Sequence, residues 1–111
     1  MTKPETLGEF EQTVLLAIAH LDDQAYGVTI RREIETRTGR AVSIGALYTA
    51  LDRLERKGLA SSRMSDPTPE RGGRSRRYYM LRAAGARALR QSRDRLARMW
   101  AGLEADLGGQ R

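Results

Sequence analysis

The clearest helical signal in this chain of 111 residues lies in Ser43-Ile44-Gly45-Ala46-Leu47-Tyr48-Thr49-Ala50-Leu51-Asp52-Arg53-Leu54-Glu55. Ser43 is a good N-cap, and Gly58 is expected to end the helix. At 100° per residue one side is apolar, and its members are Ile44, Leu47, Leu51 and Leu54. The opposite side is small and then basic, with Gly45, Ala46, Thr49, Ala50, Arg53, Arg56 and Lys57. Small residues let a helix backbone approach a surface closely, and a DNA major groove admits one helix.

Two further helices are predicted before this segment. Apolar residues recur at spacings of three and four from about Gly8 to Leu21. The pair Asp22-Asp23 is expected to stop that helix and to cap the next one. The second helix places Tyr26, Ile30 and Ile34 on its inner face and closes at Thr38-Gly39. These three short helices predict a compact helical bundle.

The periodicity changes after Gly58. Leu59–Met64 and Arg76–Leu81 are short segments that flank the loop Asp66–Arg74, in which Pro and Gly are too dense for a regular element. We predict a β-hairpin with a long basic tip, followed by one helix over Ala83–Leu107. The order helix, helix, helix, strand, basic loop, strand is that of a winged helix-turn-helix. The predicted fold class is therefore mainly α with a small β-hairpin.

The charge distribution indicates a polyanionic partner. The net charge is +6, but residues 1–30 carry one Lys against five acidic residues, so that residues 31–111 carry +10. Arg71–Arg98 alone contains ten Arg and one acidic residue. A domain with one basic end most often faces nucleic acid. Guanidinium groups at the loop tip suit phosphate and narrow minor grooves.

Several classes of protein are excluded by composition. The chain has no Cys and a single His, His20, so thiolate and multi-histidine metal sites are excluded. No apolar run approaches the ~20 residues of a membrane span, and the N-terminus lacks the layout of a secretory signal. No catalytic constellation is present. We expect no enzyme, no cofactor, no metal and no membrane partner, and a cytoplasmic location.

The motifs also resemble the PadR family of bacterial transcriptional regulators, from about Leu7 to Leu103. The resemblance lies in Tyr26-Gly27, in the segment from Ser43 to Glu55 with Gly58-Leu59, and in Gly73-Arg74 before Arg77–Leu81 and Gly85. The Ser-x-Gly-x-Leu-Tyr-x-x-Leu-x-Arg-Leu-Glu run is the most specific part. The short C-terminus is similar to the family's smaller subgroup, which has one C-terminal helix. Arg82 departs from the family's usual Thr cap, so a shifted or frayed start of the last helix is expected.

The resemblance implies a homodimeric repressor that an effector or a change in expression relieves. It implies that Tyr48 lies near the phosphate backbone, that Ser43 and Thr49 lie at the groove, and that the Arg71–Arg76 loop lies on the flanking groove. From the residues and the resemblance together, the predicted contacts with double-stranded DNA are Tyr26, Ser43, Gly45, Ala46, Tyr48, Thr49, Arg53, Lys57, Arg71, Arg74 and Arg76.

The last helix predicts an interface, because an apolar stripe on an overlong helix needs a cover. Two-fold symmetry makes a homodimer the default. The predicted interface residues are Leu89, Leu96, Met99, Trp100 and Leu103. Trp100 is interpreted as interface packing, with a site for a small planar effector as the alternative. The expected domains are a winged helix-turn-helix over residues 1–82 and a dimerisation helix with its tail over 83–111.

Alternatives to a DNA-binding repressor remain at this level. A basic RNA-binding or ribosome-associated protein is one, although apart from Tyr78 or Tyr79 the chain offers no aromatic platform for stacking bases. A ligand-responsive protein that has lost its DNA function is another. The outer face of the third helix and the arginine loop are each also compatible with an ordinary solvated surface.

Overall fold

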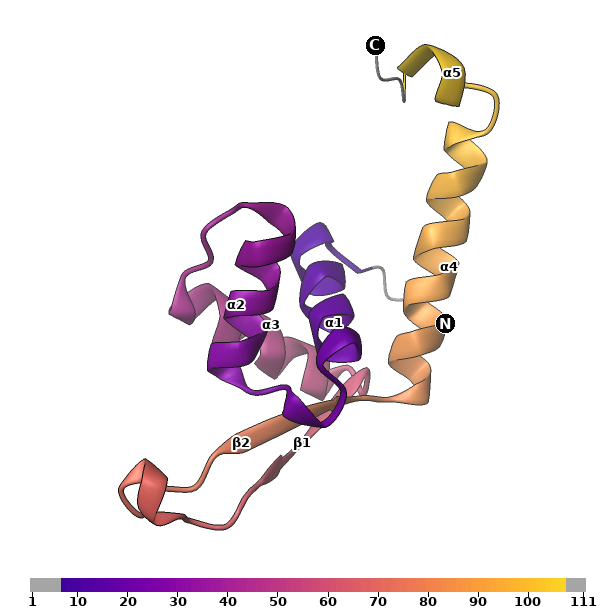
Figure 1. Cartoon of the computed structure of the whole chain (residues 1–111). Coiled ribbons are helices and arrows are strands. Elements are labelled where there is room, and N and C mark those ends of the chain that lie inside the picture. The colour runs from indigo at the N-terminus through magenta and orange to yellow at the C-terminus, as the bar shows by residue number, and fades with distance from the viewer. Residues whose placement is uncertain (1–6, 108–111) are drawn as a thin grey trace.

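The computed structural model describes residues 7–107, so the parts of the two expected domains at 1–6 and 108–111 lie outside it. Three helices, α1 (Glu9–Leu21), α2 (Gly27–Thr38) and α3 (Ile44–Arg56), form a bundle beside the hairpin of β1 (Ala60–Met64) and β2 (Arg77–Leu81). Helix α4 (Ala83–Trp100) rises away from this bundle and is followed by α5 (Glu104–Leu107) (Figure 1). The predicted fold class is confirmed.

The boundaries of α1 and α2 follow from local hydrogen bonds. The side chain of Glu11 accepts from the backbone N–H of Gly8 and so caps α1. A short 3₁₀ turn, η1 (Asp22–Gln24), separates the two helices. The prediction that Asp22-Asp23 caps α2 is wrong, because the N-cap residue is Tyr26, whose N–H donates to the Thr29 hydroxyl at 3.0 Å. Gly39 ends α2 in the left-handed conformation, with φ 73°.

Helix α3 begins as predicted but is rotated from the predicted orientation. The Ser43 hydroxyl accepts from the N–H of Ala46 at 3.1 Å, which confirms the cap. Ile44, expected in the core, is 46% exposed, whereas Ala50, expected outside, is 4% exposed. The first turn of α1 borders α3 on the Ala50 side. The buried face is therefore centred on Leu47, Ala50, Leu51 and Leu54.

The hairpin is antiparallel, with Ala60 opposite Leu81 and Met64 opposite Arg77. Its loop contains a short 3₁₀ turn, η2 (Pro69–Arg71), so the expectation of no regular element there is wrong. Pro69 presets the φ that starts this turn, and Gly72 ends it in the left-handed region. The hairpin is tied to the bundle by the N–H of Tyr79, which donates to the Ala25 carbonyl at 2.8 Å.

A single core joins the bundle and the hairpin. Its largest fully buried side chains are Val14, Leu15, Ile18, Ile30, Leu47, Leu51 and Leu54. Tyr79 contributes from β2, and Leu89 from α4 packs against the edge. The first half of α4 is therefore part of the folded unit that positions α3.

The second half of α4 projects from this unit. The radius of gyration is 16.3 Å, against about 13 Å for a compact chain of this length. The prediction of one helix over 83–107 is wrong, because the helix stops at Trp100 and Gly102 adopts φ 88° before α5. The start of α4 is not displaced by Arg82: the helix begins at Ala83, and the N–H of Ala86 donates to the Arg82 carbonyl at 3.0 Å. Within residues 7–107, no helix combines the length and apolarity needed to cross a membrane.

Candidate nucleic-acid interface

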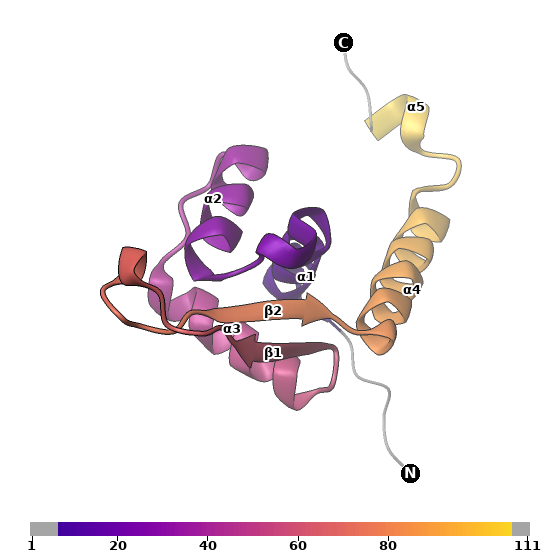
Figure 2. The ribbon, with the colours of Figure 1, turned by 60° about the horizontal axis from the view of Figure 1, so that its bottom comes forward.

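The outward face of α3 is small and uncharged over its first two turns. Ser43, Gly45, Ala46 and Thr49 are all exposed there. Beyond its neighbours in the helix, no described atom lies within 4 Å of where a Cβ on Gly45 would stand, so this backbone is open to a partner. Figure 2 shows α3 running beside the hairpin, and in Figures 1 and 2 the first turn of α3 and the hairpin loop lie on the same side of the molecule. These elements can therefore face one duplex together.

Tyr48 lies at the edge of this face and packs on the start of α2. A Cβ on Gly27 would stand 2.1 Å from the Tyr48 hydroxyl oxygen. Glycine at position 27 is therefore what lets the hydroxyl end of Tyr48 approach α2, while 46% of the residue stays exposed. The hydroxyl end of the ring therefore lies against Gly27, and the exposed part of Tyr48 stands at the edge of the α3 face.

Arginine and tyrosine side chains alternate between the hairpin and α2. The guanidinium of Arg76 lies 3.9 Å from the centroid of the Tyr26 ring, and Tyr26 meets Tyr78 edge-on at 5.4 Å. On the other side, Arg63 lies 5.0 Å from the centroid of the Tyr78 ring. Cation–π contacts of this kind contribute about 0.5–1 kcal/mol each at exposed sites. We call Tyr26, Arg63, Arg76 and Tyr78 the wing clasp, because they fix the hairpin against α2.

At the tip of the wing, Arg71 and Arg74 have different environments. The Arg71 guanidinium donates to the Ser65 hydroxyl at 3.0 Å and to the Asp66 carbonyl at 2.7 Å, so it holds the loop from within. The Arg74 side chain is exposed, and its Nε donates to the Arg71 carbonyl at 3.2 Å. The predicted basic tip is thus a loop that Arg71 supports from within and in which Arg74 faces solvent.

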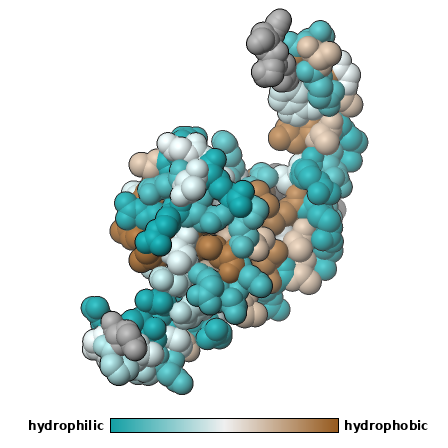
Figure 3. All heavy atoms as spheres, in the orientation of Figure 1, coloured by the Kyte–Doolittle hydropathy of each residue, from teal (hydrophilic) through white to brown (hydrophobic). Residues whose placement is uncertain are grey.

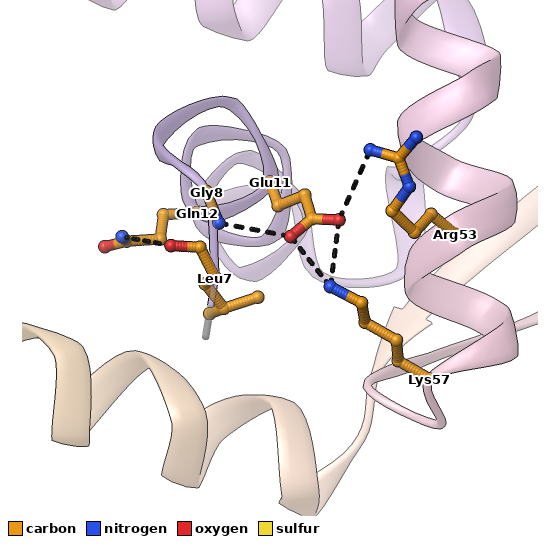
Figure 4. A network of polar contacts seen from close by, with 6 residues as sticks. All are labelled: Leu7, Gly8, Glu11, Gln12, Arg53 and Lys57. Carbon is orange, nitrogen blue, oxygen red and sulfur yellow. Dashed lines mark hydrogen bonds and ion pairs between the residues drawn. The ribbon is translucent and has the colours of Figure 1, made fainter. Parts of the chain in front are cut away.

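The two predicted cations at the C-terminal half of α3 meet a carboxylate of α1 (Figure 4). Lys57 donates to both carboxylate oxygens of Glu11, at 3.0 and 3.1 Å. Arg53 lies 3.7 Å from the same carboxylate. The Arg53 side chain is 53% exposed, whereas that of Lys57 is 18% exposed. Arg53 therefore remains open to a partner while Lys57 is turned toward α1.

Sequence reasoning omitted three residues of this surface: Arg63, Arg77 and Glu11. Arg63 stands opposite Tyr78 in the hairpin register, and exposed Arg77 donates to the Ser62 hydroxyl at 2.9 Å. The register of the hairpin would have indicated Arg63, but the alternation of the strands was too weak to predict it. Glu11 was visible only as one of several acidic residues, since its partner lies 46 residues away.

Behind the hairpin, burial raises the pKa of the Tyr79 hydroxyl, and the nearby Arg77 guanidinium opposes this increase. The hydroxyl therefore stays protonated at neutral pH and supplies no charge to the surface. Within the part of the chain that the structure describes, no three His, Asp or Glu side chains come together as a metal site would require. The chemistry available at this surface is that of cations, hydroxyls and small side chains.

A family model described as the transcriptional regulator PadR-like family matches residues 15–91, which contain α2, α3, the hairpin and the first half of α4. The chain belongs to the PadR-like family. It is a DNA-binding transcriptional regulator with a winged helix-turn-helix fold, as its sequence predicted.

Similar proteins agree with this membership. The transcriptional regulator Rv3488 of Mycobacterium tuberculosis is 37% identical over 107 residues, which cover 92% of this chain and 91% of that protein. A PadR-like transcription factor from Bacteroides fragilis is similar in structure, with a TM-score of 0.70 and 26% identity over 81% of this chain and 82% of its own. A PadR family regulator from Eggerthella lenta gives 0.67 and 25%, over 92% and 88% of the two chains.

Proposed function

We propose that this PadR-like regulator is a homodimeric repressor that binds a pseudo-palindromic operator in double-stranded DNA. The observation that carries the proposal is the pairing of a small, exposed helix face with an arginine-bearing wing on the same side of the molecule. A helix with such a face can enter a major groove while the wing follows the adjacent groove. Two-fold symmetry then places two half-sites about one helical turn apart.

The proposed contacts divide into two kinds. Ser43, Gly45, Ala46 and Thr49 approach base edges, because they are the exposed residues at the start of α3. The contacts to phosphate and to the shape of the groove come from Tyr48, Arg53 and Arg74. Two members of the wing clasp, Tyr26 and Arg76, add to them. Arg71 supports the loop from inside, and Lys57 is bound to Glu11. Phosphate contacts position the protein, and base contacts select the sequence.

Dimerisation is proposed through the projecting part of α4. The exposed apolar residues there are Leu96, Met99, Trp100, Leu103 and Leu107. Figure 3 shows hydrophobic surface on this arm, beyond the body of the bundle. An apolar strip that residues 7–107 leave exposed on a helix is typical of an interface between subunits. Leu89 packs on the core of its own chain, so it lies at the base of the proposed interface.

A small planar effector is proposed to bind at this seam, since a shallow apolar hollow of about 170 Å³ is lined by Trp100 and its neighbours. Trp100 is the only tryptophan of the chain, so its fluorescence reports directly on this site. Titration with a panel of planar cationic dyes should quench it. An unchanged spectrum across the panel would exclude the effector. We also propose a cytoplasmic location, where a DNA-binding regulator meets its operator.

The test of the DNA contacts compares Thr49→Ala with Arg74→Ala. Selection of binding sites from genomic fragments with the purified protein first yields the operator and shows whether its half-sites are symmetric. Thr49→Ala should then change base preference and leave binding to random duplex within about twofold. Arg74→Ala should weaken binding to both duplexes and lower the log–log salt slope by about 0.9.

Two results would contradict the proposal. If the two substitutions act alike on operator and random duplex, the assignment of base and phosphate contacts is wrong. If RNA of equal length competes as well as duplex DNA, the RNA-binding alternative replaces the repressor.

A further inference from the structure

Glu11 is a buried carboxylate at the border of the proposed DNA-binding surface. Its side chain is 8% exposed, yet it lies in the first turn of α1, within reach of solvent-facing residues of α3. One oxygen accepts from the Gly8 N–H at 3.2 Å, and both accept from Lys57. A charge withdrawn from water to this extent requires cations around it, and α3 supplies them.

The cations that bind Glu11 belong to the same stripe of α3 as the residues proposed to enter the groove. Ala46, Thr49, Arg53 and Lys57 follow one another at spacings of three and four, so they share one side of the helix. The same residues line a shallow hollow of about 620 Å³ between α3 and the first turn of α1. The stripe is thus open at its N-terminal end and closed by Glu11 at its C-terminal end.

A carboxylate and a phosphate compete for the same cation. Both are anionic oxygen acceptors, and the charge of an ammonium bound at about 3 Å to both oxygens of one carboxylate is largely compensated, so it attracts a second anion weakly. Arg53 is different, because its contact with Glu11 is long at 3.7 Å and more than half of its side chain is exposed. The two cations therefore have unequal access to the backbone of a duplex.

We propose that Glu11 is a positioning residue for DNA recognition, which holds Lys57 away from the phosphates and leaves Arg53 as the phosphate-binding cation of this stripe. The inference rests on the proposed function, since it assumes that α3 faces the duplex. It reverses the role predicted for Lys57 from sequence alone. It also means that α1, which carries no proposed DNA contact, sets the number of cations that α3 offers to DNA.

The decisive experiment is the salt dependence of binding to a random-sequence duplex by Glu11→Gln. Glutamine keeps the shape of the side chain and an oxygen for the Gly8 N–H, but it removes the negative charge that binds Lys57. One additional phosphate contact steepens the log–log salt slope by about 0.9. If both proteins extrapolate to the same affinity at about 1 M salt, Glu11→Gln binds about eightfold more tightly than the wild type at about 0.1 M salt. A slope that equals that of the wild type, with or without a lower melting temperature, overturns the proposal.

Glu33→Gln is the matched control. It removes the same unit of charge and breaks an ion pair with Arg37, but on α2, on a surface formed with α1 rather than α3. The expected salt slope is that of the wild type. If Glu33→Gln steepens the slope as much as Glu11→Gln does, net charge alone is responsible and the positioning role is wrong.

Lys57→Gln tests the same point in a protein that keeps Glu11. In the wild-type background it should leave the salt slope unchanged, whereas in the Glu11→Gln background it should restore the wild-type slope. A loss of about 0.9 in the wild-type background means that Lys57 already binds phosphate, and it overturns the proposal even if Glu11→Gln fails to fold.

Arg53→Gln separates this inference from the proposed function. It should lower the slope by about 0.9 in the wild type. If neither Arg53→Gln nor Arg74→Ala alters binding to duplex DNA, the proposed surface is wrong. If both weaken binding while the Glu11 and Lys57 variants behave contrary to expectation, only the positioning role fails.

Discussion

At the residue scale, glycines mark the closest approaches between elements. A Cβ on Gly85 of α4 would stand 2.2 Å from the carbonyl oxygen of Leu59, which is a backbone atom and cannot swing aside. A Cβ on Gly27 would meet only the end of the Tyr48 side chain, and one on Gly45 would meet nothing. The three glycines thus differ in whether they can be replaced by a residue with a Cβ. Their contacts with other elements decide this, and helix propensity does not.

We expect Gly85→Ala and Gly45→Ala to have opposite effects on stability. Gly85→Ala forces α4 away from the start of the hairpin and should lower the free energy of unfolding by about 1–3 kcal/mol. Gly45→Ala should raise it by about 0.5 kcal/mol, because alanine loses less backbone entropy in a helix. Urea denaturation measures both. Gly45→Ala should also weaken operator binding, and unchanged binding would show that DNA does not approach this backbone closely.

Tyr79 predicts a specific pH dependence of stability. Its pKa in the unfolded chain is close to the ordinary value of 10.0, and burial raises it in the folded protein. The unfolded chain therefore loses this proton first, so the contribution of Tyr79 is fully present below about pH 10 and declines as the pH rises above it. Tyr79→Phe should remove that part of the decline. Urea midpoints of the two proteins between pH 8 and 11 should converge or cross, and parallel curves would contradict the assignment.

At the element scale, the wing depends on a few side chains rather than on a core of its own. Its two strands pair along five residues each, and the clasp of Arg63, Tyr78, Tyr26 and Arg76 fixes them against α2. Beyond the strands, Arg71 connects both sides of the loop. Arg71 therefore supports the loop together with the η2 turn, although the sequence shows a run of equivalent arginines.

Arg71→Ala should loosen the loop without unfolding the protein. The lost hydrogen bonds to Ser65 and Asp66 should make amide hydrogen exchange at Gly73 and Arg74 about tenfold faster, while exchange in α1 and α3 stays as in the wild type. Arg74→Ala removes the same charge and should leave the exchange of the loop nearly unchanged. Equal exchange in the two variants would show that Arg71 does not order the wing.

The helices also show which structural features could be predicted from the sequence. The stop of α2 and the cap of α3 were readable, since Gly39 and Ser43 act on neighbours three or four residues away, whereas the cap of α2 was not. The sequence did not predict that Ile44 is exposed and Ala50 is buried, because the burial of these residues depends on where α1 packs. The apolar periodicity in α4 continues past Trp100, but it carries no information on the break at Gly102.

At the scale of the whole molecule, the exposed strip on α4 predicts a dimer. Met99, at 74% exposure, is its most accessible large side chain. Met99→Glu should turn the dimer into a monomer in analytical ultracentrifugation and weaken operator binding, because a single half-site contact remains. Gln91→Glu adds the same charge to another face of α4 and should stay dimeric. A wild-type protein that is monomeric at 50 μM would exclude this interface.

What the sequence determined by itself is whatever acts over one or two helical turns: the three-helix bundle, the cap at Ser43, the hairpin and the basic character of the wing. The tertiary structure alone decided which cations of that basic surface are available. Arg71 is bound within the loop and Lys57 is bound to Glu11 across 46 residues, whereas Arg53 and Arg74 stay exposed. The physical reason is that a charge is visible in a sequence, but its partner is set by the packing of distant elements.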